Sequence, residues 1–471
     1  MPRVPLWRYA LAALVGVVSS ASAQNRPGSA YHVPTTTRPT PAWYDDAKLG
    51  IFIHWGAYSV PAWAPPLTPA DVATFDWSHA MENNPYAEWY LNTMKFPDSP
   101  TGRHHAATWG RNFDYTNFFR TFDQESRRWN PDQWARLFRR SGARYVVLTT
   151  KHHDGFLLWP SRQVNPNRPA DLQHTTRDIV GELTAAVRRN GMRMGLYYSG
   201  GLDWSFNPAR IDDVPSMRKT IPNTEAYGRY ADQHWRELIE RYQPSILWND
   251  IGYPSTGQPA AIVRDFYART PDGVVNNRWG NDLGDYLTPE FQNVPDVPPH
   301  KWESCRGIGF SFGYNAAEQA ENMLTSAQLI EMFVDIVARN GNLLLDLGPR
   351  PDGSIPELQL ERLNALGDWL RVNGDGIFGT RPWRQPTGTT VDGLPIRYTR
   401  KGRTLFAFLM SPTGASVVLP DLRDLEVSRV RQLGSRRPLR FAKTETGLSV
   451  TLTPAASGYP LGLAIETTGE P

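Results

Sequence analysis

The stretch Ser245-Ile246-Leu247-Trp248-Asn249-Asp250-Ile251-Gly252 places a carboxylate where an apolar run ends in a glycine-marked turn. The run from Ser245 to Trp248 predicts a short strand buried on both faces, which is typical of parallel sheets. In a barrel of alternating strands and helices, catalytic side chains gather at the carboxyl ends of such strands. A lone Asp in this position also commonly caps a helix or stabilises a turn, so Asp250 alone leaves both roles open.

Several other apolar runs end in polar or ionisable residues in the same way. These runs are Phe52-Ile53-His54-Trp55-Gly56, Leu148–Gly155, Leu196–Gly200 and Val275–Trp279. Because the carboxyl ends of parallel strands meet at one edge of a sheet, these side chains are expected to converge on one polar pocket. This convergence favours a catalytic role for Asp250.

Strand patterns alternate with helical patterns from about residue 43 onward. The predicted strands lie near residues 49–54, 143–150, 192–199, 245–250, 273–277 and 342–347. The predicted helices cover residues 132–141, 176–189, 225–241 and 327–340. This alternation predicts an α/β fold, either a (β/α)₈-like TIM barrel with two strands still to be found or an open doubly wound sheet. No glycine-rich phosphate loop follows the first strand, which favours the barrel.

The chain divides into four predicted parts. Residues 1–23 have the features of a signal peptide, because two arginines precede a short apolar stretch and Ala21-Ser22-Ala23 has the form of a cleavage site. An N-terminal arm covers residues 24–42, and the catalytic barrel covers residues 43–380. Short alternating runs over residues 381–471 predict a small antiparallel β-sandwich. We therefore expect an exported protein, periplasmic or extracellular, without a membrane anchor.

Composition narrows the choice of partners. The formal net charge of +3 falls to about +1 without Arg3 and Arg8 of the leader, which argues against nucleic acid or an anionic membrane as the main partner. The single cysteine, Cys305, can form no internal disulfide, and we interpret it as a buried small residue. An oligomer is compatible with this composition.

Seven motifs follow one another between about residues 42 and 380. They are Trp43–Pro61, Tyr86–Tyr90, Lys151–Phe156, Gly195–Ser199, Leu247–Asp250, Arg306–Asn315 and Asn340–Leu345. In this order they resemble the α-L-fucosidases of glycoside hydrolase family 29. The resemblance implies a retaining exo-α-L-fucosidase that acts on fucosylated glycans or aryl fucosides without a metal or other cofactor. It also implies a (β/α)₈-like barrel followed by a β-sandwich.

The resemblance assigns two catalytic carboxylates. Asp250 stands at the position of the nucleophile, and Glu290 in Thr288-Pro289-Glu290-Phe291 stands at the acid/base position of the branch that tolerates aryl glycosides. Double displacement needs one carboxylate to attack the anomeric carbon and a second to protonate the leaving oxygen and then activate water. Without the family, Glu290 would be a surface loop residue. Glu303 in Lys301-Trp302-Glu303 is the main rival for its role.

The resemblance also assigns substrate contacts. The ring hydroxyls of fucose are expected to contact His54, Glu88, Trp89, His152, His153, Tyr197 and Arg278. The wall against the C5 methyl group is expected to consist of Phe52, Tyr86, Trp248 and Phe312. An apolar wall leaves an additional hydroxyl unpaired and so favours the deoxy sugar.

Two alternatives remain open from the residues alone. The first is a metal-dependent hydrolase built on His152-His153-Asp154; adjacent side chains on an extended segment point opposite ways, which disfavours it, and an EDTA challenge would decide it. The second is a sugar-binding protein without turnover, which the presence of both Asp250 and Glu290 disfavours. The segment 65–84 is either a loop over the pocket or a plain surface insertion.

Overall fold

The computed structural model describes residues 38–68, 71, 75, 79–280, 282–292, 294, 296–410, 414–453 and 458–471. The predicted signal peptide and most of the predicted arm lie outside these residues. None of the described helices is both long enough and apolar enough to cross a membrane.

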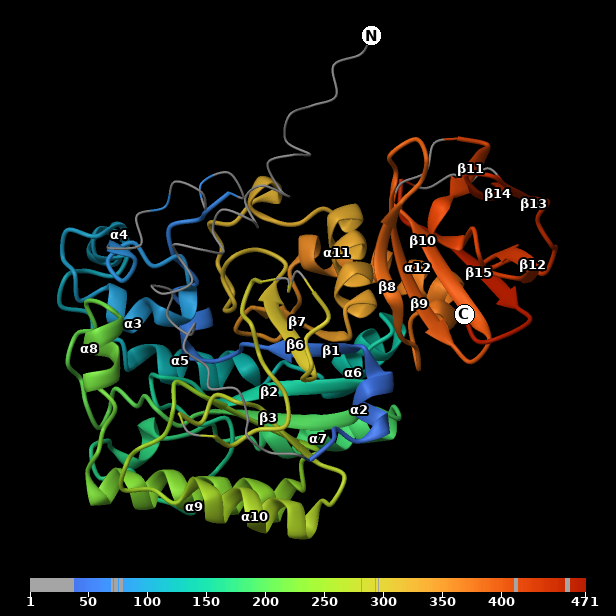
Figure 1. Ribbon diagram of the computed structural model, residues 1–471. Helices are drawn as coiled ribbons and strands as arrows, with labels where there is room; N and C mark the ends of the chain where they lie inside the picture. Colours follow the sequence, from blue (N-terminus) through green and yellow to red (C-terminus); the bar gives the residue numbers. More distant parts are fainter. Residues whose placement is uncertain are drawn as a thin grey trace.

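A parallel sheet of seven strands forms the centre of the molecule, with the strand order β5-β4-β3-β2-β1-β7-β6 (Figure 1). The strands are β1 (Leu49–Ile53), β2 (Tyr145–Lys151), β3 (Arg193–Ser199), β4 (Ile246–Asp250), β5 (Val274–Val275), β6 (Trp302–Gly307) and β7 (Gly341–Leu347). Neighbours in the sheet are mostly neighbours in the chain, as in a barrel, whereas a doubly wound sheet reverses its strand order. The predicted TIM-like barrel fold is confirmed.

A short extended segment lies between β5 and β6. Tyr286 forms a parallel bridge with Asn276, which follows β5, and Leu287 forms one with Trp302, the first residue of β6. Glu290 forms a third bridge, with Cys305 in β6. Residues 285–291 therefore occupy the place of an eighth strand, and they bring Glu290 to the barrel wall.

Helices pack around the sheet, and several of them begin at side-chain caps. The longer ones are α5 (Asn117–Ser126), α6 (Pro131–Arg140), α7 (Ile179–Arg189), α9 (Glu225–Tyr242), α10 (Pro259–Arg269), α11 (Ser326–Ala338) and α12 (Glu357–Asn373). The side chain of Asn130 accepts from the N–H groups of Asp132 and Gln133 at the start of α6. Thr325 and Gln328 form a capping box before α11. The four helices predicted from the sequence are confirmed as α6, α7, α9 and α11.

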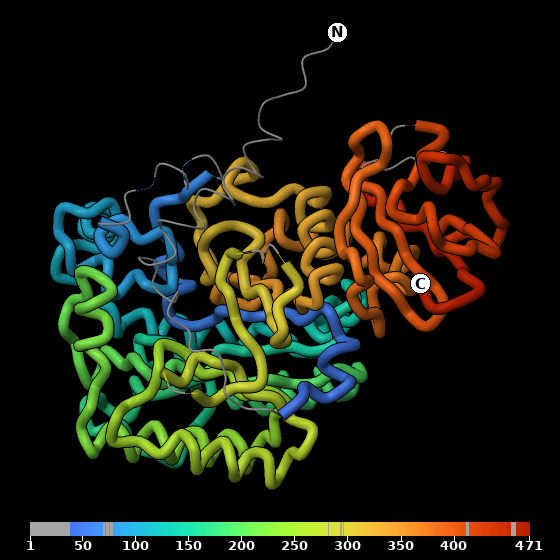
Figure 2. The backbone as a smooth tube through the Cα atoms, in the orientation of Figure 1, coloured from blue at the N-terminus to red at the C-terminus, as the bar shows by residue number. Residues whose placement is uncertain are grey.

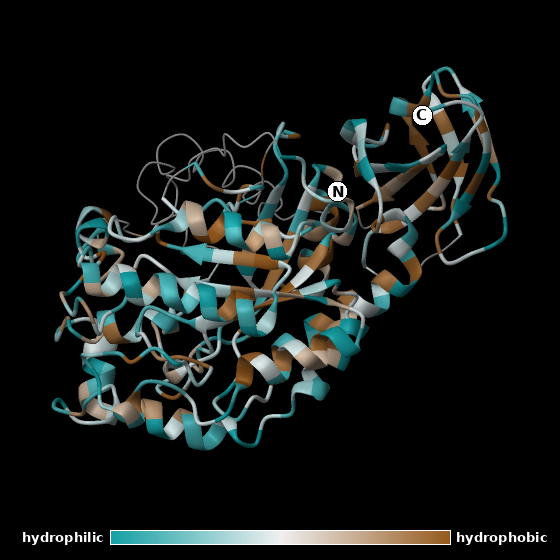
Figure 3. Ribbon diagram, turned by 90° about the horizontal axis from the view of Figure 1, so that it is seen from below, coloured by the Kyte–Doolittle hydropathy of each residue, from teal (hydrophilic) through white to brown (hydrophobic). Residues whose placement is uncertain are grey.

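Shorter helices belong to the connections. They are α2 (Ala42–Ala47), α3 (Tyr90–Thr93), α4 (Pro100–Thr108), α8 (Val214–Lys219) and the single turns η1 (Ala57–Ser59), η4 (Ala87–Trp89), η5 (Ala170–Leu172), η6 (Ala320–Asn322), η7 (Gly374–Gly376) and η8 (Pro420–Leu422). Hydrophobic residues concentrate on the strands and on one face of several helices, as Figure 3 shows. This pattern places the core between the sheet and its helices.

The last part of the chain forms a lobe of two antiparallel sheets beside α11 and α12 (Figures 1 and 2). Its strands are β8 (Arg381–Thr389), β9 (Pro395–Lys401), β10 (Thr404–Leu409), β11 (Ser416–Leu419), β12 (Val427–Gln432), β13 (Phe441–Thr444), β14 (Gly447–Thr451) and β15 (Leu461–Thr467). The sheet orders are β12-β15-β10-β9-β8 and β11-β14-β13. This arrangement is the predicted small antiparallel β-sandwich.

Candidate active site

The predicted polar site residues lie at the carboxyl ends of the barrel strands. His54 follows β1, His152 and His153 follow β2, Tyr197 lies in β3, Asp250 ends β4, and Arg278 follows β5. All six residues are buried, each with less than a tenth of its surface exposed. The expected convergence of these strand ends is therefore observed, because Arg278 and Tyr197 both bond to Asp250, and the ring of His152 lies 5.6 Å from that of His54 and 5.9 Å from that of Tyr197.

Arg278 joins the two predicted catalytic carboxylates. Its Nη1 atom donates to Oδ1 of Asp250 at 3.1 Å and to Oε2 of Glu290 at 3.0 Å. These two oxygens therefore lie no more than about 6 Å apart. The second oxygen of Asp250 accepts from the hydroxyl of Tyr197 at 2.9 Å, and the second oxygen of Glu290 accepts from that of Tyr86 at 3.3 Å.

The position of Arg278 is fixed from three sides. Its Nε donates to the hydroxyl of Thr288 at 3.0 Å, and its Nη2 donates to the carbonyl oxygen of Thr288 at 3.0 Å. Nη2 also lies 3.2 Å from Sγ of Cys305, and the guanidinium stacks over Trp248 at 4.6 Å from the ring centre. Thr288, in the motif of Glu290, thus orients the group that binds both carboxylates.

Burial dominates the proton affinity of Glu290. It raises the pKa of this carboxyl, and the nearby charge of Asp250 raises it further, while Arg278 and the Tyr86 hydroxyl act in the opposite direction. A carboxyl with a raised pKa keeps its proton to a higher pH than a free glutamic acid does. Glu290 can therefore donate a proton under conditions in which an exposed carboxyl would be ionised.

Glu303, the rival for the acid/base role, has a different environment. It is fully buried in β6, and its carboxylate accepts from Tyr44 at 2.9 Å, from Tyr145 at 2.5 Å and from Nε1 of Trp248 at 3.1 Å. The hydroxyl and indole donors account for both of its oxygens. This arrangement favours a role in holding Trp248 in place over a role in proton transfer to a substrate.

The histidines form a compact group with unequal partners. The ring centres of His152 and His153 lie 3.9 Å apart, so the expectation that these side chains point opposite ways is wrong. The reason is that residues 152–155 form a turn and not an extended segment. The N–H of Gly155 closes this turn by donating to the carbonyl oxygen of His152 at 3.0 Å. His153 Nδ1 lies 2.6 Å from the hydroxyl of Ser199. In the described structure the buried Nδ1 of His152 has no hydrogen-bond partner. Burial lowers the pKa of His152 to about 3, so this ring is neutral.

His54 pairs with a carboxyl that the sequence did not reveal. Its Nδ1 lies 2.6 Å from Oδ1 of Asp346, which lies near the end of β7. Burial lowers the pKa of His54 and raises that of Asp346. The signal was present, because Asp346 closes an apolar run as Asp250 does, but the motif used for the resemblance ends one residue earlier.

Glu88 connects η4 to the loop after β6. Its Oε2 accepts from the N–H of Gly313 at 2.8 Å, and the hydroxyl of Ser311 accepts from the N–H of Ala87 at 2.9 Å. Burial raises the pKa of Glu88 to about 8. Two segments far apart in the sequence are thereby joined beside the candidate site.

Aromatic rings surround these polar groups. Phe52 packs against Trp248 with ring centres 4.9 Å apart, and Phe312 packs against His54 at 5.0 Å. Tyr86 lies next to Phe312 at 5.6 Å. Three of the four residues predicted as an apolar wall therefore contact predicted sugar-binding residues, because Phe52 also lies 4.6 Å from His54 and Trp248 stacks with Tyr197 at 5.5 Å. Trp89 lies at the edge of His153, with ring centres 5.0 Å apart.

Phe291 is a further aromatic residue at the site, which the sequence did not single out. Its φ angle is 51°, a left-handed conformation that is uncommon for an aromatic residue. Its ring packs against Phe312 at 5.2 Å and stacks with Phe310 at 5.7 Å. The backbone thus turns sharply directly after Glu290.

The surroundings of the site are partly described. Parts of the predicted loop 65–84 lie outside the described residues, but the start of the loop is fixed: Asn315 exchanges hydrogen bonds with the backbone of Ala64 at 3.2 and 3.1 Å. Within the described ranges, no three His, Cys, Asp or Glu side chains are placed to hold a metal ion together. Cys305 is buried, as predicted.

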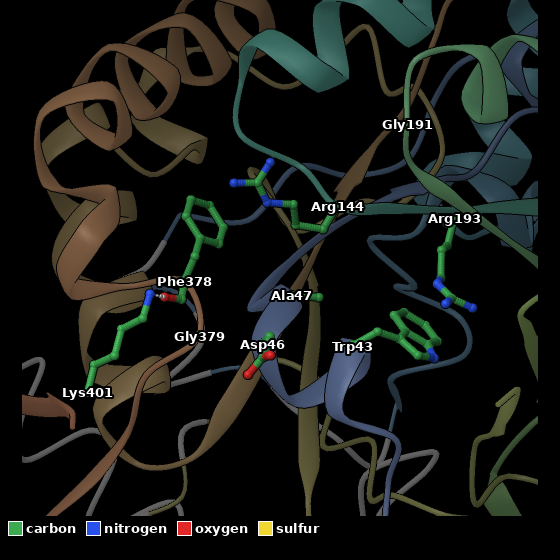
Figure 4. Close-up of a pocket in the computed structure, with 9 residues that line it drawn as sticks. All are labelled: Trp43, Asp46, Ala47, Arg144, Gly191, Arg193, Phe378, Gly379 and Lys401. Carbon is green, nitrogen blue, oxygen red and sulfur yellow. Dashed lines mark hydrogen bonds between the residues drawn. The ribbon is translucent and has the colours of Figure 1, made fainter.

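A hollow of about 340 Å³ lies at the other end of the barrel (Figure 4). Arg144 and Arg193, which line it, stand at the amino ends of β2 and β3. Phe378 contributes from the connection to β8, with the guanidinium of Arg144 4.1 Å above its ring. The hollow is therefore separate from the carboxylate pair, which lies at the carboxyl ends of the strands.

Comparison with known proteins gives consistent matches. A family model described as Alpha-L-fucosidase matches residues 17–375. An α-L-fucosidase of Dictyostelium discoideum is 37% identical over 363 residues, covering 74% of this chain and 73% of that protein. The tissue α-L-fucosidase of Bos taurus is 33% identical over 454 residues, covering 92% and 89%. The crystal structure of Thermotoga maritima α-fucosidase in complex with fucose superposes with a TM-score of 0.82 at 41% identity, covering 91% of this chain and 97% of that chain.

Proposed function

Because this chain belongs to the α-L-fucosidase family and is a glycosidase, we propose that it removes terminal α-L-fucosyl residues from glycans by a retaining double displacement. Asp250 is the nucleophile and Glu290 the acid/base. The observation that carries this assignment is the shared contact of both carboxylates with Nη1 of Arg278. The two oxygens that it binds lie at most about 6 Å apart, which supports the closely spaced carboxyl groups of a retaining enzyme, roughly 5–5.5 Å apart, over the roughly 6.5–9.5 Å of an inverting one.

The two steps use the carboxylates in turn. Asp250 attacks the anomeric carbon while Glu290 donates its proton to the glycosidic oxygen, and the bond to the leaving group breaks. Water then attacks the glycosyl ester as Glu290 takes its proton, and the ester bond to Asp250 breaks. The raised pKa of Glu290 supports the first step, because the acid must be protonated when substrate binds.

The buried polar side chains bind the sugar ring. His54, Glu88, His152 and Arg278 offer buried donors and acceptors, next to which an unmatched polar group of the wrong sugar is costly. Among the described residues Nδ1 of His152 has no hydrogen-bond partner, which supports a bond from this ring to a sugar hydroxyl group. The rings of Phe52, Trp248 and Phe312, with Tyr86, form the wall that receives the C5 methyl group.

Replacing Asp250 tests the mechanism. Asp250→Gly removes the nucleophile, so hydrolysis of an aryl α-L-fucoside should stop while the circular dichroism spectrum stays unchanged. Added azide should restore turnover and give the fucosyl azide of inverted configuration, because azide fits the space that the carboxylate leaves. Asp250→Asn, which keeps the shape, should be inactive and should not respond to azide. Near-normal hydrolysis by either variant would refute the assignment.

Export is the second part of the proposal. The apolar stretch after Arg8 and the small residues before Gln24 support cleavage between Ala23 and Gln24. Sequencing the amino terminus of the protein recovered outside the cytoplasm should therefore begin at Gln24. A protein that stays in the cytoplasm and retains Met1 would contradict this part alone.

A further inference from the structure

Charge is distributed unevenly along the chain. Residues 381–471 contain 13 Lys and Arg against 7 Asp and Glu, a net charge of +6. Residues 43–380 contain 33 against 40, a net charge of −7. The near balance of the whole chain thus conceals a basic β-sandwich attached to an acidic barrel.

The positive charge concentrates in one hairpin of the sandwich. Residues 427–444 include Arg429, Arg431, Arg436, Arg437, Arg440 and Lys443 and no Asp or Glu. We call residues 427–440 the basic hairpin. The strand β12, which begins it, is an edge strand of its sheet and lies on the outer side of the lobe in Figure 1.

The register of the basic hairpin gathers its arginines on the solvent face. Arg431 pairs with Pro438 in an antiparallel bridge, and the N–H of Leu439 donates to the carbonyl oxygen of Val430 at 2.8 Å. Val430 is fully buried in the sandwich core, so its neighbours along the strand face the other way. Continuing the register places Arg440 opposite Arg429, on the same outward face.

Few carboxylates neutralise this face. Glu466 lies 3.8 Å from Arg429, Asp375 lies 4.0 Å from Arg431, and Glu426 is paired with Lys443. Three exposed cations of the basic hairpin form no ion pair with any described residue. They are Arg436, Arg437 and Arg440. Their guanidinium groups are available to an external anion.

We propose that the basic hairpin binds an anionic polysaccharide that carries sulfate or carboxylate groups. Guanidinium groups match such oxyanions with paired hydrogen bonds, and a row of them matches a repeating polymer. Membership of a glycosidase family favours a glycan over nucleic acid. So does the hairpin's lack of a stacking surface, since Phe441, the only aromatic residue in 427–444, packs against the sandwich core. Binding here would raise the local concentration of substrate chains near the barrel.

Retention on immobilised dextran sulfate at physiological salt, with uncharged dextran as reference, tests the proposal with the full-length protein. The wild type should bind dextran sulfate and not dextran, and binding should weaken as salt rises. Substituting Arg436→Gln, Arg437→Gln and Arg440→Gln together should lower the affinity at least about tenfold. Hydrolysis of a small aryl fucoside should be unchanged, so the result is independent of the proposed catalytic residues.

A matched variant distinguishes the effect of the basic hairpin on affinity from the effect of the protein's net charge. Arg136, Arg218 and Arg264 are exposed on the barrel and form no ion pair within the described structure. Changing these three to Gln removes the same charge and should leave the affinity within about twofold of the wild type. Equal losses in both triple variants would overturn the proposal, as would absence of wild-type binding. Binding of duplex DNA as tight as that of dextran sulfate would indicate a nucleic-acid partner instead.

Discussion

Arg278 gives the two carboxylates of the site a common partner and yet leaves them in different environments. Among the described residues, the Asp250 carboxylate accepts from the guanidinium of Arg278 and from the hydroxyl of Tyr197. Glu290 has a weaker second partner in Tyr86, and burial raises its pKa. Pairs of carboxyl groups whose surroundings differ in this way are suited to separate roles as nucleophile and acid.

Replacing Glu290 should affect substrates according to their leaving groups. An activated aryl group needs little protonation, whereas a sugar leaving group needs much, so Glu290→Ala should slow oligosaccharide hydrolysis about 10²- to 10⁴-fold more than release of the aryl group. The wild-type kcat/KM for an oligosaccharide should fall as pH rises through the raised pKa of Glu290, and this fall should disappear in the variant. Steady-state kinetics on both substrate types over a range of pH provide the measurement.

Glu303→Gln is the control for this assignment. It keeps an acceptor for the indole N–H of Trp248 and should slow both substrate types to a similar extent. A larger selective loss with oligosaccharides in the Glu303 variant than in the Glu290 variant would reverse the two roles.

Glu88 should make the folded state less stable as pH rises. Its pKa is about 8 in the folded protein, above the value near 4.5 of an exposed glutamic acid, so the folded state holds a proton that the unfolded state has released. Between about pH 5 and 8 Glu88 should therefore contribute a decrease in the free energy of unfolding with rising pH, and Glu88→Gln should remove this contribution, up to about 1.4 kcal/mol per pH unit. Urea unfolding at several pH values measures the slope. An unchanged slope in the variant would show that Glu88 is ionised in the folded protein.

Most strands of the barrel could be predicted from the sequence, and the reason for the exceptions is their composition. The runs that became β1 to β4 and β7 are apolar on both faces, as burial in a parallel sheet requires. The strand β6, with sequence Trp-Glu-Ser-Cys-Arg-Gly, contains no apolar run. Its buried Glu303 is compensated by hydrogen bonds, so hydrophobicity does not reveal this strand. Residues 285–291 pair only through isolated bridges and show no alternation.

The residues of the candidate site also divide into those that the sequence reveals and those that it does not. Residues at the ends of apolar strands, such as His54 and Asp250, could be found from position alone. Glu290 lies on an irregular segment, and only the family resemblance selected it. Arg278 lies in a run whose polar end the sequence marked, but its role came from the resemblance. Phe291 and the partner of His54, Asp346, became visible only through contacts in the folded chain.

Asn276 completes the sheet at the element that carries Asp250. The strand β5 is only two residues long, and the side chain of Asn276 replaces the missing pairing: its Oδ1 accepts from the N–H of Asn249 at 3.0 Å, and its Nδ2 donates to the Asn249 carbonyl oxygen at 2.9 Å. Asn276→Ala leaves both backbone groups unpaired in the interior and should lower the free energy of unfolding by about 1–3 kcal/mol for each. Urea unfolding measures this loss.

The same variant should also reduce catalysis, because Asn249 precedes the nucleophile. Asn276→Asp keeps the acceptor but buries a carboxylate against the carbonyl oxygen of Asn249, so at neutral pH it should lower stability at least as much as the alanine variant. A stable Asn276→Ala enzyme with unchanged kcat would show that the paired side chain is not needed to hold the end of β4.

At the scale of the whole molecule, the strand β10 connects two hydrophobic cores. Leu405, Ala407 and Leu409 face the core between the two antiparallel sheets, whereas Phe406 and Phe408 pack into the main core. The ring centre of Phe408 lies 5.8 Å from that of Trp369 in α12, and the indole N–H of Trp369 donates to the carbonyl oxygen of Pro460 at 2.7 Å. The sandwich and the barrel therefore share buried surface.

This shared surface predicts that barrel and sandwich unfold together. Phe408→Ala should lower the free energy of unfolding by about 3–5 kcal/mol, the usual range for a fully buried Phe. Intrinsic fluorescence and loss of activity should report a single common thermal transition, and its midpoint temperature should fall. Leu405→Ala is the matched control, because it lies on the same strand and faces only the sandwich core. If the two parts are one cooperative unit, Leu405→Ala also lowers the temperature at which activity is lost. The opposite result would be two separate transitions, with activity retained above the one whose temperature Leu405→Ala lowers. It would show that the barrel stays folded after the sandwich has unfolded.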